Sequence, residues 1–201
     1  MKLFGITGGI GMGKSVAGSL LAKQGMAVLD TDDLARKLVE PGQEALAEIA
    51  GLFGASVLLS DGCLDRQKLA GYVFADAAAR AKLEAILHPK IHAAWQAEVE
   101  KWRVSGGKEG AVIIPLLYEI KAEKLFDAVI CVACGAESQL ARLRCRGWSE
   151  AEIRQRLDSQ LSVNEKLTRA DFVIWTDTTL EAHEAQLQKM RQTMTEAMAR
   201  H

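Results

Sequence analysis

The order of apolar and polar positions along the chain predicts strands that alternate with helices. Short apolar runs rich in β-branched residues are typical of buried strands, whereas apolar positions three or four apart are typical of helices. Five such runs are expected to be strands: "KLFGIT" from Lys2, "MAVLD" from Met26, "AVII" from Ala111, "AVICVA" from Ala128 and "DFVIWT" from Asp171. Because strands that alternate with helices form parallel sheets covered on both faces, we expect a three-layer α/β/α fold around a central five-stranded parallel sheet.

Local signals mark the ends of the expected helices. The helix from Lys14 to Gln24 should end at Gly25, and the helix in "DDLARKLV" should end at the turn "EPG". A basic helix, "SQLARLRCRG", closes with a glycine. Capping-box spacing predicts three more helix starts, near Ser149 with Glu152, Ser162 with Glu165, and Thr178 with Glu181.

The last helix is expected from Leu180 to about Ala199. One side of it is apolar, and we expect this side to face the core; it comprises Leu180, Leu187, Met190, Met194 and Met198. The stretch from Gln43 to Val104 is mostly helical in pattern, with one loop at "SDGCLD". Because it follows the second strand, it looks like a helical insertion into the α/β core.

Composition narrows the class of protein. The chain has 201 residues, of which 49% are apolar and 25% charged, so that it can bury a sizeable core. The formal net charge of −1 removes any global electrostatic case for binding nucleic acid or an anionic membrane. Without a secretory leader or an apolar stretch of membrane-spanning length, the sequence predicts a cytoplasmic protein.

The four cysteines show no disulfide spacing. Cys131 and Cys134 form a C-x-x-C pair within an apolar strand, where residues three apart point to opposite faces. No second pair completes a metal site, so we interpret both as small buried hydrophobes.

The segment "GGIGMGKS", Gly8 to Ser15, follows the first strand and begins the first helix. It matches the phosphate-binding pattern G-x-x-x-x-G-K-[ST]. Bare backbone allows successive N–H groups to approach phosphate oxygens, and the helix N-terminus adds positive potential. Lys14 would neutralise β- and γ-phosphate charge, and Ser15 would ligate Mg²⁺. The pattern therefore predicts a site for ATP or GTP.

A nucleotide-binding loop alone does not identify the reaction that a protein catalyses. The guanine-recognition patterns D-x-x-G and N-K-x-D are absent, and the strand "AVII" runs into Pro115 where a motor ATPase would carry an acid. Acidic residues instead follow the second strand in "VLDTDD", at the end where parallel sheets bind ligands. Asp30 or Asp32 could accept a proton from a substrate hydroxyl or orient Mg²⁺. Asp33 would cap a helix or face solvent, which is also the alternative for Asp30.

Seven blocks in order resemble the dephospho-CoA kinase family, and they cover nearly the whole chain. They are "GITGGIGMGKS", "VLDTDDLAR", "VEPG", "LHPKI", "PLLYE", "QLARLRCR" and "RADFVI". The resemblance implies a P-loop NTPase core that phosphorylates the 3′-hydroxyl of dephospho-CoA with ATP and Mg²⁺, which is the last step of coenzyme A synthesis. It also implies a helical substrate-binding insertion and a mobile helical lid.

The resemblance assigns roles to particular residues. Asp32 would be the base and, with Ser15, a metal ligand; Lys14 and Arg142 would also be catalytic. Arg142 and Arg146, four apart on one helix face, would clamp the ATP phosphates, although a solvated basic face is the alternative. The remaining expected nucleotide contacts come from Gly9, Ile10, Gly11, Met12, Gly13 and Val16. The expected substrate contacts, besides Asp32, are Thr7, His88, Pro115 and Leu116.

His88 allows two interpretations: it could donate to the substrate, or the His-Pro pair could break a helix. The expected domains are a core of residues 1–40, 110–136 and 168–201, a substrate domain of 41–109 and a lid of 137–167. The chain departs from the family where Trp175 and Thr176 stand in a region that commonly holds an asparagine.

Two other functions stay open, another P-loop small-molecule kinase (for a nucleoside monophosphate or a sugar acid) and a regulatory module that only binds nucleotide. We expect a monomer or weak homo-oligomer.

Overall fold

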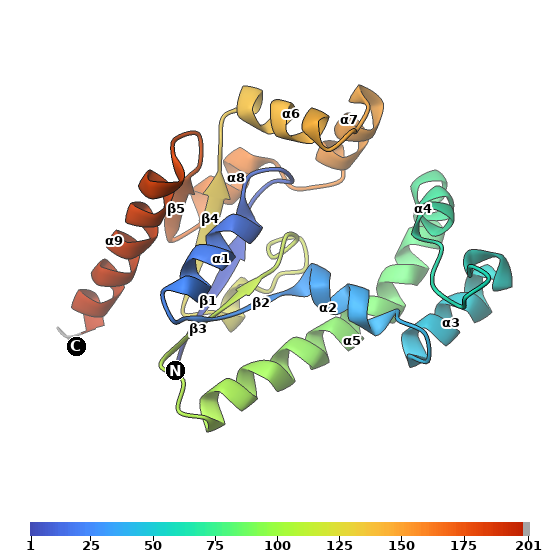
Figure 1. Ribbon diagram of the computed structural model, residues 1–201, viewed down its shortest axis with the longest axis horizontal. Helices are drawn as coiled ribbons and strands as arrows, with labels where there is room; N and C mark the ends of the chain where they lie inside the picture. Colours follow the sequence, from blue (N-terminus) through green and yellow to red (C-terminus); the bar gives the residue numbers. More distant parts are fainter. Residues whose placement is uncertain (199–201) are drawn as a thin grey trace. The chain divides into compact units, whose positions relative to one another are not determined.

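The strands and helices follow one another largely as the apolar pattern predicts (Figure 1). The structure is a computed structural model that describes residues 1–198, except the side chains of 74, 75 and 195–198. The end of the last helix at Ala199, the side chain of Met198 and the end of the core segment 168–201 therefore lie outside the described residues. The chain divides into two compact units, Met1–Asp30 with Trp102–His201, and Thr31–Lys101.

The first unit contains a five-stranded parallel sheet of order β2-β3-β1-β4-β5, which confirms the expected sheet. The strands are β1 (Lys2–Thr7), β2 (Ala27–Asp30), β3 (Glu109–Ile113), β4 (Ala128–Ala133) and β5 (Phe172–Trp175). Its helices are α1 (Lys14–Lys23), α6 (Ala136–Cys145), α7 (Glu150–Asp158), α8 (Val163–Arg169) and α9 (Leu180–Met198), with a 3-10 turn η2 (Glu123–Leu125). Because the strands are parallel, their carboxyl ends share one edge, where the loops that follow them gather.

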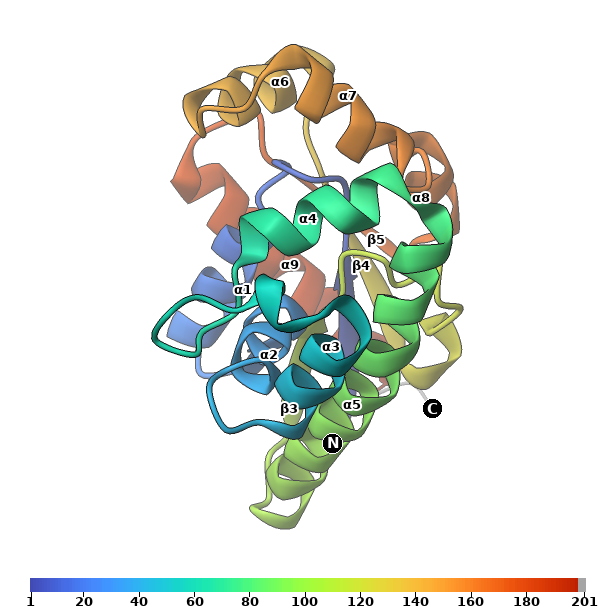
Figure 2. The same ribbon diagram turned by 90° about the vertical axis from the view of Figure 1, so that its right-hand side faces the viewer.

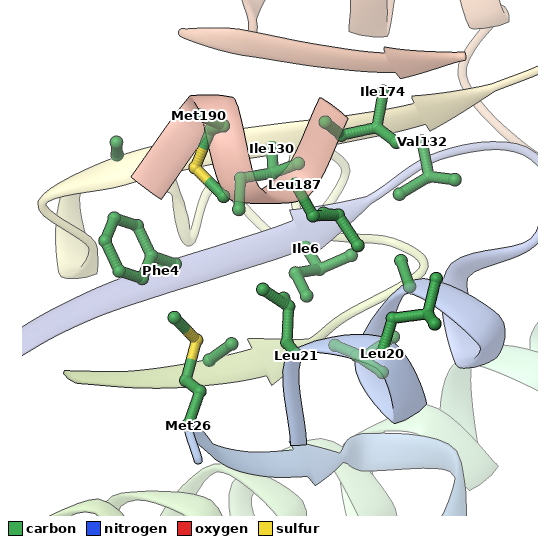
Figure 3. Packing of buried hydrophobic residues seen from close by; sticks show 14 residues of the cluster. Phe4, Ile6, Leu20, Leu21, Met26, Ile130, Val132, Ile174, Leu187 and Met190 are labelled. Atoms are coloured by element: carbon green, nitrogen blue, oxygen red, sulfur yellow. The ribbon is translucent and has the colours of Figure 1, made fainter. Parts of the chain in front are cut away.

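Helices α1 and α9 cover one face of the sheet. Leu20 and Leu21 of α1 and Leu187 and Met190 of α9 are buried against alternate residues of the strands, such as Ile130 (Figure 3). The other face carries α8 and the segment between β3 and β4, whose Leu117 and Phe126 side chains fill the space beside Gly5. This arrangement gives the three layers predicted for the fold.

In the same unit, α6 and α7 follow one another at the end of the sheet where the strands finish (Figure 2). The helix starts expected at Ser149 and Ser162 are confirmed, because each hydroxyl accepts a hydrogen bond from the third residue of its helix. The last helix begins at Leu180 as expected, near Thr178, but its capping residue is Thr179 and not Thr178. Thr179 Oγ1 accepts from the N–H of Ala182.

The apolar side of α9 is core-facing only in part. Leu187 and Met190 are buried and Met194 is partly buried, but Leu180 is 51% exposed. Leu180, the first residue of α9, borders a pocket described below.

The second unit is helical, as expected for the insertion. Its helices are α2 (Thr31–Leu38), α3 (Glu44–Phe53), α4 (Arg66–Ala75) and α5 (Ala77–Val104), with a 3-10 turn η1 (Ala55–Val57). Its core is formed by Val39, Ala45, Ile49, Val57 and Leu69, with partly buried Leu83, Ile86 and Leu87 of α5 packed against them. None of the helices within the described residues is long and apolar enough to cross a bilayer.

Candidate active site

The glycine-rich loop connects β1 to α1 at the carboxyl edge of the sheet. Gly8, Gly11 and Gly13 have φ values of 143°, 77° and 96°, which residues with side chains rarely adopt. A Cβ atom on Gly8 would also lie 2.1 Å from the carbonyl oxygen of Val132 in β4. The loop therefore needs glycine both for its backbone conformation and for its close approach to the neighbouring strand.

Gly13 is the N-cap residue of α1 and has no side chain that could accept a hydrogen bond from the first turn. The amides of a helix N-terminus are hydrogen-bond donors, and the helix dipole favours an anion beside them. Ser15 and Val16, in that first turn, are exposed. The start of α1 is thus suited to an anionic ligand such as a phosphate.

Lys14 folds back over the loop. Its Nζ donates hydrogen bonds to the carbonyl oxygens of Gly8 and Gly9, both at 3.0 Å. The ammonium charge is consequently held over the loop backbone, where it can meet the charge of a bound phosphate.

Two glutamines from outside the loop hold the peptide groups on either side of Ile10. Gln139 of α6 donates from Nε2 to the Ile10 carbonyl oxygen at 2.8 Å. Gln160, which follows α7, accepts from the Ile10 N–H through Oε1 at 3.3 Å. Gln139 begins the block "QLARLRCR" but was given no role there, and Gln160 lies outside all seven blocks, so sequence reasoning missed both contacts.

Arg142 of α6 points at the same loop. Its guanidinium donates from Nη1 to Thr176 Oγ1 at 2.9 Å, from Nη2 to the Thr176 carbonyl, and from Nη1 to the Gly11 carbonyl at 3.5 Å. Arg146, the C-cap residue of α6, is exposed and borders the same pocket. The two arginines thus line one pocket beside the loop, as their spacing predicts.

This pocket has a volume of about 550 Å³ and belongs wholly to the first unit. The loop, α6, the segment after β5 and the start of α9 contribute to it. Its lining residues are Gly11, Gly13, Val16, Ala141, Arg142, Cys145, Arg146, Thr176, Thr178 and Leu180. A mixed wall of apolar groups and guanidinium charge is suited to a nucleotide.

The carbonyl oxygen of Pro115 accepts hydrogen bonds from two side chains. Thr7 Oγ1 donates to it at 3.1 Å and the Nζ of Lys166 at 2.9 Å. Lys166, on α8, is fully buried and forms an ion pair with Glu119 at 2.8 Å. The structure therefore brings together Thr7 and Pro115, two of the expected substrate residues, and Leu116 beside Pro115 is partly buried. The ion pair of Lys166 with Glu119 is a feature that the sequence did not indicate.

Asp32 and His88 belong to the second unit. Asp32 is exposed in the first turn of α2, which begins directly after Asp30 ends β2. Asp33 is on the surface, where its carboxylate pairs with Arg36 at 3.1 Å. Because the Asp32 side chain is exposed, a ligand can reach it.

His88 is exposed on α5, and the interpretation of His-Pro as a helix break is wrong because α5 continues through Pro89. Proline within a helix costs roughly 3 kcal/mol. Packing of Ile86 and Leu87 into the core of the unit, and ion pairs from Lys90 to Glu44 and Glu48, hold the helix on both sides of it.

Within the described residues, no group of three or more His, Cys, Asp or Glu side chains forms a metal centre. Mg²⁺ does not need one, since it commonly binds through one or two protein oxygens together with water and phosphates. Ser15, exposed at the start of α1, fits this mode. Cys131 and Cys134 are buried, and burial raises the pKa of the Cys131 thiol to about 11.

A parallel sheet of order 2-3-1-4-5, with the glycine loop after its central strand and Lys14 and Arg142 turned toward that loop, is typical of the P-loop proteins that bind nucleoside triphosphates. The sequence profile of the family described as CoaE, dephospho-CoA kinase, matches residues 2–182. The chain therefore belongs to the dephospho-CoA kinase family. It is accordingly an enzyme of coenzyme A biosynthesis that acts in the final step.

Individual relatives agree with this membership. A dephospho-CoA kinase of Anaeromyxobacter dehalogenans is 48% identical over 175 residues, which cover 87% of this chain and 83% of that protein. Among solved structures, dephospho-CoA kinase from Campylobacter jejuni is 28% identical with a TM-score of 0.72, covering 98% of this chain and 99% of the other. A Thermus thermophilus protein is 32% identical with a TM-score of 0.82, covering 96% and 97%.

Proposed function

We propose that the chain transfers the γ-phosphoryl group of ATP to the 3′-hydroxyl of the ribose of dephospho-CoA, giving coenzyme A and ADP. The observation that supports this most directly is that Lys14 and Arg142 both donate hydrogen bonds to carbonyl oxygens of the glycine loop, in a chain of this family. A cytoplasmic location and a monomer or weak homo-oligomer stay predictions.

The loop would bind the ATP phosphates through the residues Gly9, Ile10, Gly11, Met12, Gly13, Lys14, Ser15 and Val16. In the structure, Lys14 bonds to two carbonyl oxygens and the Ile10 N–H bonds to Gln160. A phosphate would replace these partners, because its oxygens carry negative charge, whereas the carbonyl and amide oxygens that now accept from Lys14 and Ile10 are neutral. Arg142 and Arg146 would add positive charge beside the phosphates, which stabilises charge on the transferring group.

Mg²⁺ bound with ATP would neutralise phosphate charge and orient the γ-phosphoryl group. Ser15 and Asp32 are the residues we propose to hold it, since a hydroxyl and a carboxylate supply the oxygen ligands that Mg²⁺ prefers.

Asp32 is also the proposed general base. An exposed carboxylate can accept the proton that the ribose hydroxyl loses as it attacks phosphorus. In the sequence it follows Asp30, the last residue of β2, by two positions.

The acceptor would bind to Thr7, His88, Pro115 and Leu116, and we propose that residues 41–109 hold its coenzyme A portion. Residues 137–167 would act as the lid, since Gln139, Arg142 and Gln160 reach the loop from this segment. A lid that excludes water would prevent hydrolysis of ATP in place of transfer.

The direct test is detection of the product by mass. The protein is incubated with ATP, Mg²⁺ and dephospho-CoA, and in parallel with a nucleoside monophosphate or a sugar acid as acceptor. Coenzyme A should form only in the first mixture, and none should form without Mg²⁺. ADP formation with another acceptor and no coenzyme A would overturn the proposal.

A further inference from the structure

Thr176 occupies a buried position between the phosphate-binding loop and the arginine of α6. It follows β5, and its N–H donates to the carbonyl oxygen of Ala133 at 2.8 Å, which continues the β4–β5 pairing by one residue. The residue is 5% exposed. Its backbone is therefore fixed by the sheet, and its side chain has a defined direction.

The Thr176 hydroxyl bonds to both neighbours at once. It donates to the carbonyl oxygen of Met12 at 3.0 Å and accepts from Arg142 Nη1 at 2.9 Å. A hydroxyl has one proton and a guanidinium can only donate, so the direction of both bonds is determined. The result is a chain of hydrogen bonds that runs from Arg142 through Thr176 to Met12.

The bond to Met12 orients the loop. Because a peptide group is planar and trans, a carbonyl held on one side turns the following N–H to the opposite side. Anchoring the Met12 carbonyl at Thr176 therefore directs the Gly13 N–H away from Thr176. The Thr176 methyl group also limits the space beside Gly13, since a Cβ added there would lie 3.4 Å from it.

The bonds to Arg142 orient the guanidinium. Thr176 receives one hydrogen bond at its hydroxyl and another at its carbonyl from the two terminal nitrogens of Arg142. A guanidinium held at both ends has little rotational freedom, so little is lost when a ligand binds to it.

We propose that Thr176 is a positioning residue that sets the direction of the Gly13 amide and the orientation of Arg142 before ATP binds. The inference rests on the proposed function only in that ATP is the ligand of the loop. It assigns Thr176 no contact with the reacting atoms.

The test compares Thr176→Val, which keeps the shape and removes the hydroxyl, with Thr176→Ser, which keeps the hydroxyl. Loss of two hydrogen bonds should lower kcat/KM for ATP by about tenfold or more in Thr176→Val. Thr176→Ser should stay within about threefold of the original protein. Thr193→Val, which removes an exposed hydroxyl that bonds only within α9, is the matched control and should leave kcat/KM unchanged.

Two further measurements separate positioning from a merely structural role. Thr176→Val should lower kcat/KM less in an Arg142→Ala background than in the original protein, because part of its effect acts through Arg142. In proton–nitrogen correlation spectra of the ligand-free protein, the terminal guanidinium nitrogens of Arg142 should give separate signals that merge in Thr176→Val. The signals of Arg142 are assigned as those that disappear in Arg142→Lys, which has no guanidinium group at this position.

The inference is overturned if Thr176→Val stays within about twofold of the original protein, if Thr176→Ser loses as much activity as Thr176→Val, or if the Arg142 signals are unchanged. If Thr176→Val does not fold at the assay temperature, Thr176→Ala replaces it in the same comparisons. Failure of the original protein to make coenzyme A would overturn the proposed function alone, because the spectra need no ligand.

Discussion

Lys166 and Glu119 form an ion pair of 2.8 Å in which the lysine side chain is completely buried. The same Nζ donates to the Pro115 carbonyl, and Glu119 Oε1 accepts from the N–H of Leu161. The pair therefore joins α8, the segment before it and the loop after β3.

Removal of one member of the Lys166–Glu119 ion pair should destabilise the folded protein. Lys166→Met keeps the length of the side chain but leaves the Glu119 carboxylate without its counter-charge, which should reduce the free energy of unfolding by about 3–5 kcal/mol. Thermal unfolding should show a Tm lower by on the order of 10 °C. Lys166→Met combined with Glu119→Gln should recover part of the loss. A Tm within about 2 °C of the original for the single variant would contradict a stabilising role for the lysine.

Lys14→Ala should impair transfer without impairing the fold. Removal of one preorganised donor from the phosphate site should lower kcat by roughly 100- to 1,000-fold. Steady-state assays and thermal unfolding measure the two effects separately. Lys23→Ala, an exposed change at the far end of the same helix, is the control and should behave like the original protein. An unfolded Lys14→Ala protein would instead make the lysine a structural residue.

Asp32→Asn should lower turnover much more than ATP affinity. Loss of a general base typically costs about 10²–10⁴ in rate, whereas the amide keeps the size of the side chain. The measurement is kcat and the KM for ATP in the same assay, with the neighbouring surface change Asp33→Asn as the control. If Asp32→Asn retains near-normal turnover, Asp30 becomes the candidate base.

Thiol labelling should report nucleotide binding at one cysteine. Cys145 is exposed and lines the pocket beside Arg142 and Arg146, so a thiol reagent should modify it fastest. Burial and the raised pKa of Cys131 should keep that thiol unreactive in the folded protein. ATP should slow labelling of Cys145 in proportion to the fraction of protein bound, while Cys63 in the second unit should react at an unchanged rate. Equal protection of both cysteines would argue against this location of the nucleotide.

His183 should make stability depend on pH. Burial, and secondarily the charge of Arg142, lowers the pKa of His183 from 6.5, and its Nε2 is buried with no hydrogen-bond partner in the described part of the chain. The unfolded chain then binds more protons than the folded chain just below pH 6.5, so stability should fall as the pH drops through that value. Denaturant unfolding between pH 8 and 5 should give a flatter profile for His183→Leu. Parallel profiles for the two proteins would exclude His183 as the cause.

The sequence predicted the features whose causes are local. Strand and helix periodicity, the caps at Ser149 and Ser162 and the conformation of the glycine loop each depend on a few neighbouring residues, and each was predicted correctly. Local reasoning failed at Pro89, where packing on both sides outweighs the cost of proline in the helix.

By itself, then, the sequence determined the parallel α/β core, the loop for phosphate and the arginine pair of α6, because periodicity and close spacing specify them. Only the tertiary structure decided that Thr176 joins Met12 to Arg142, that Gln139 and Gln160 hold Ile10, and that Lys166 is buried against Glu119. These bonds join residues 34 to 164 positions apart. Their partners are chosen by how the helices pack at the end of the sheet, and no local pattern records that choice.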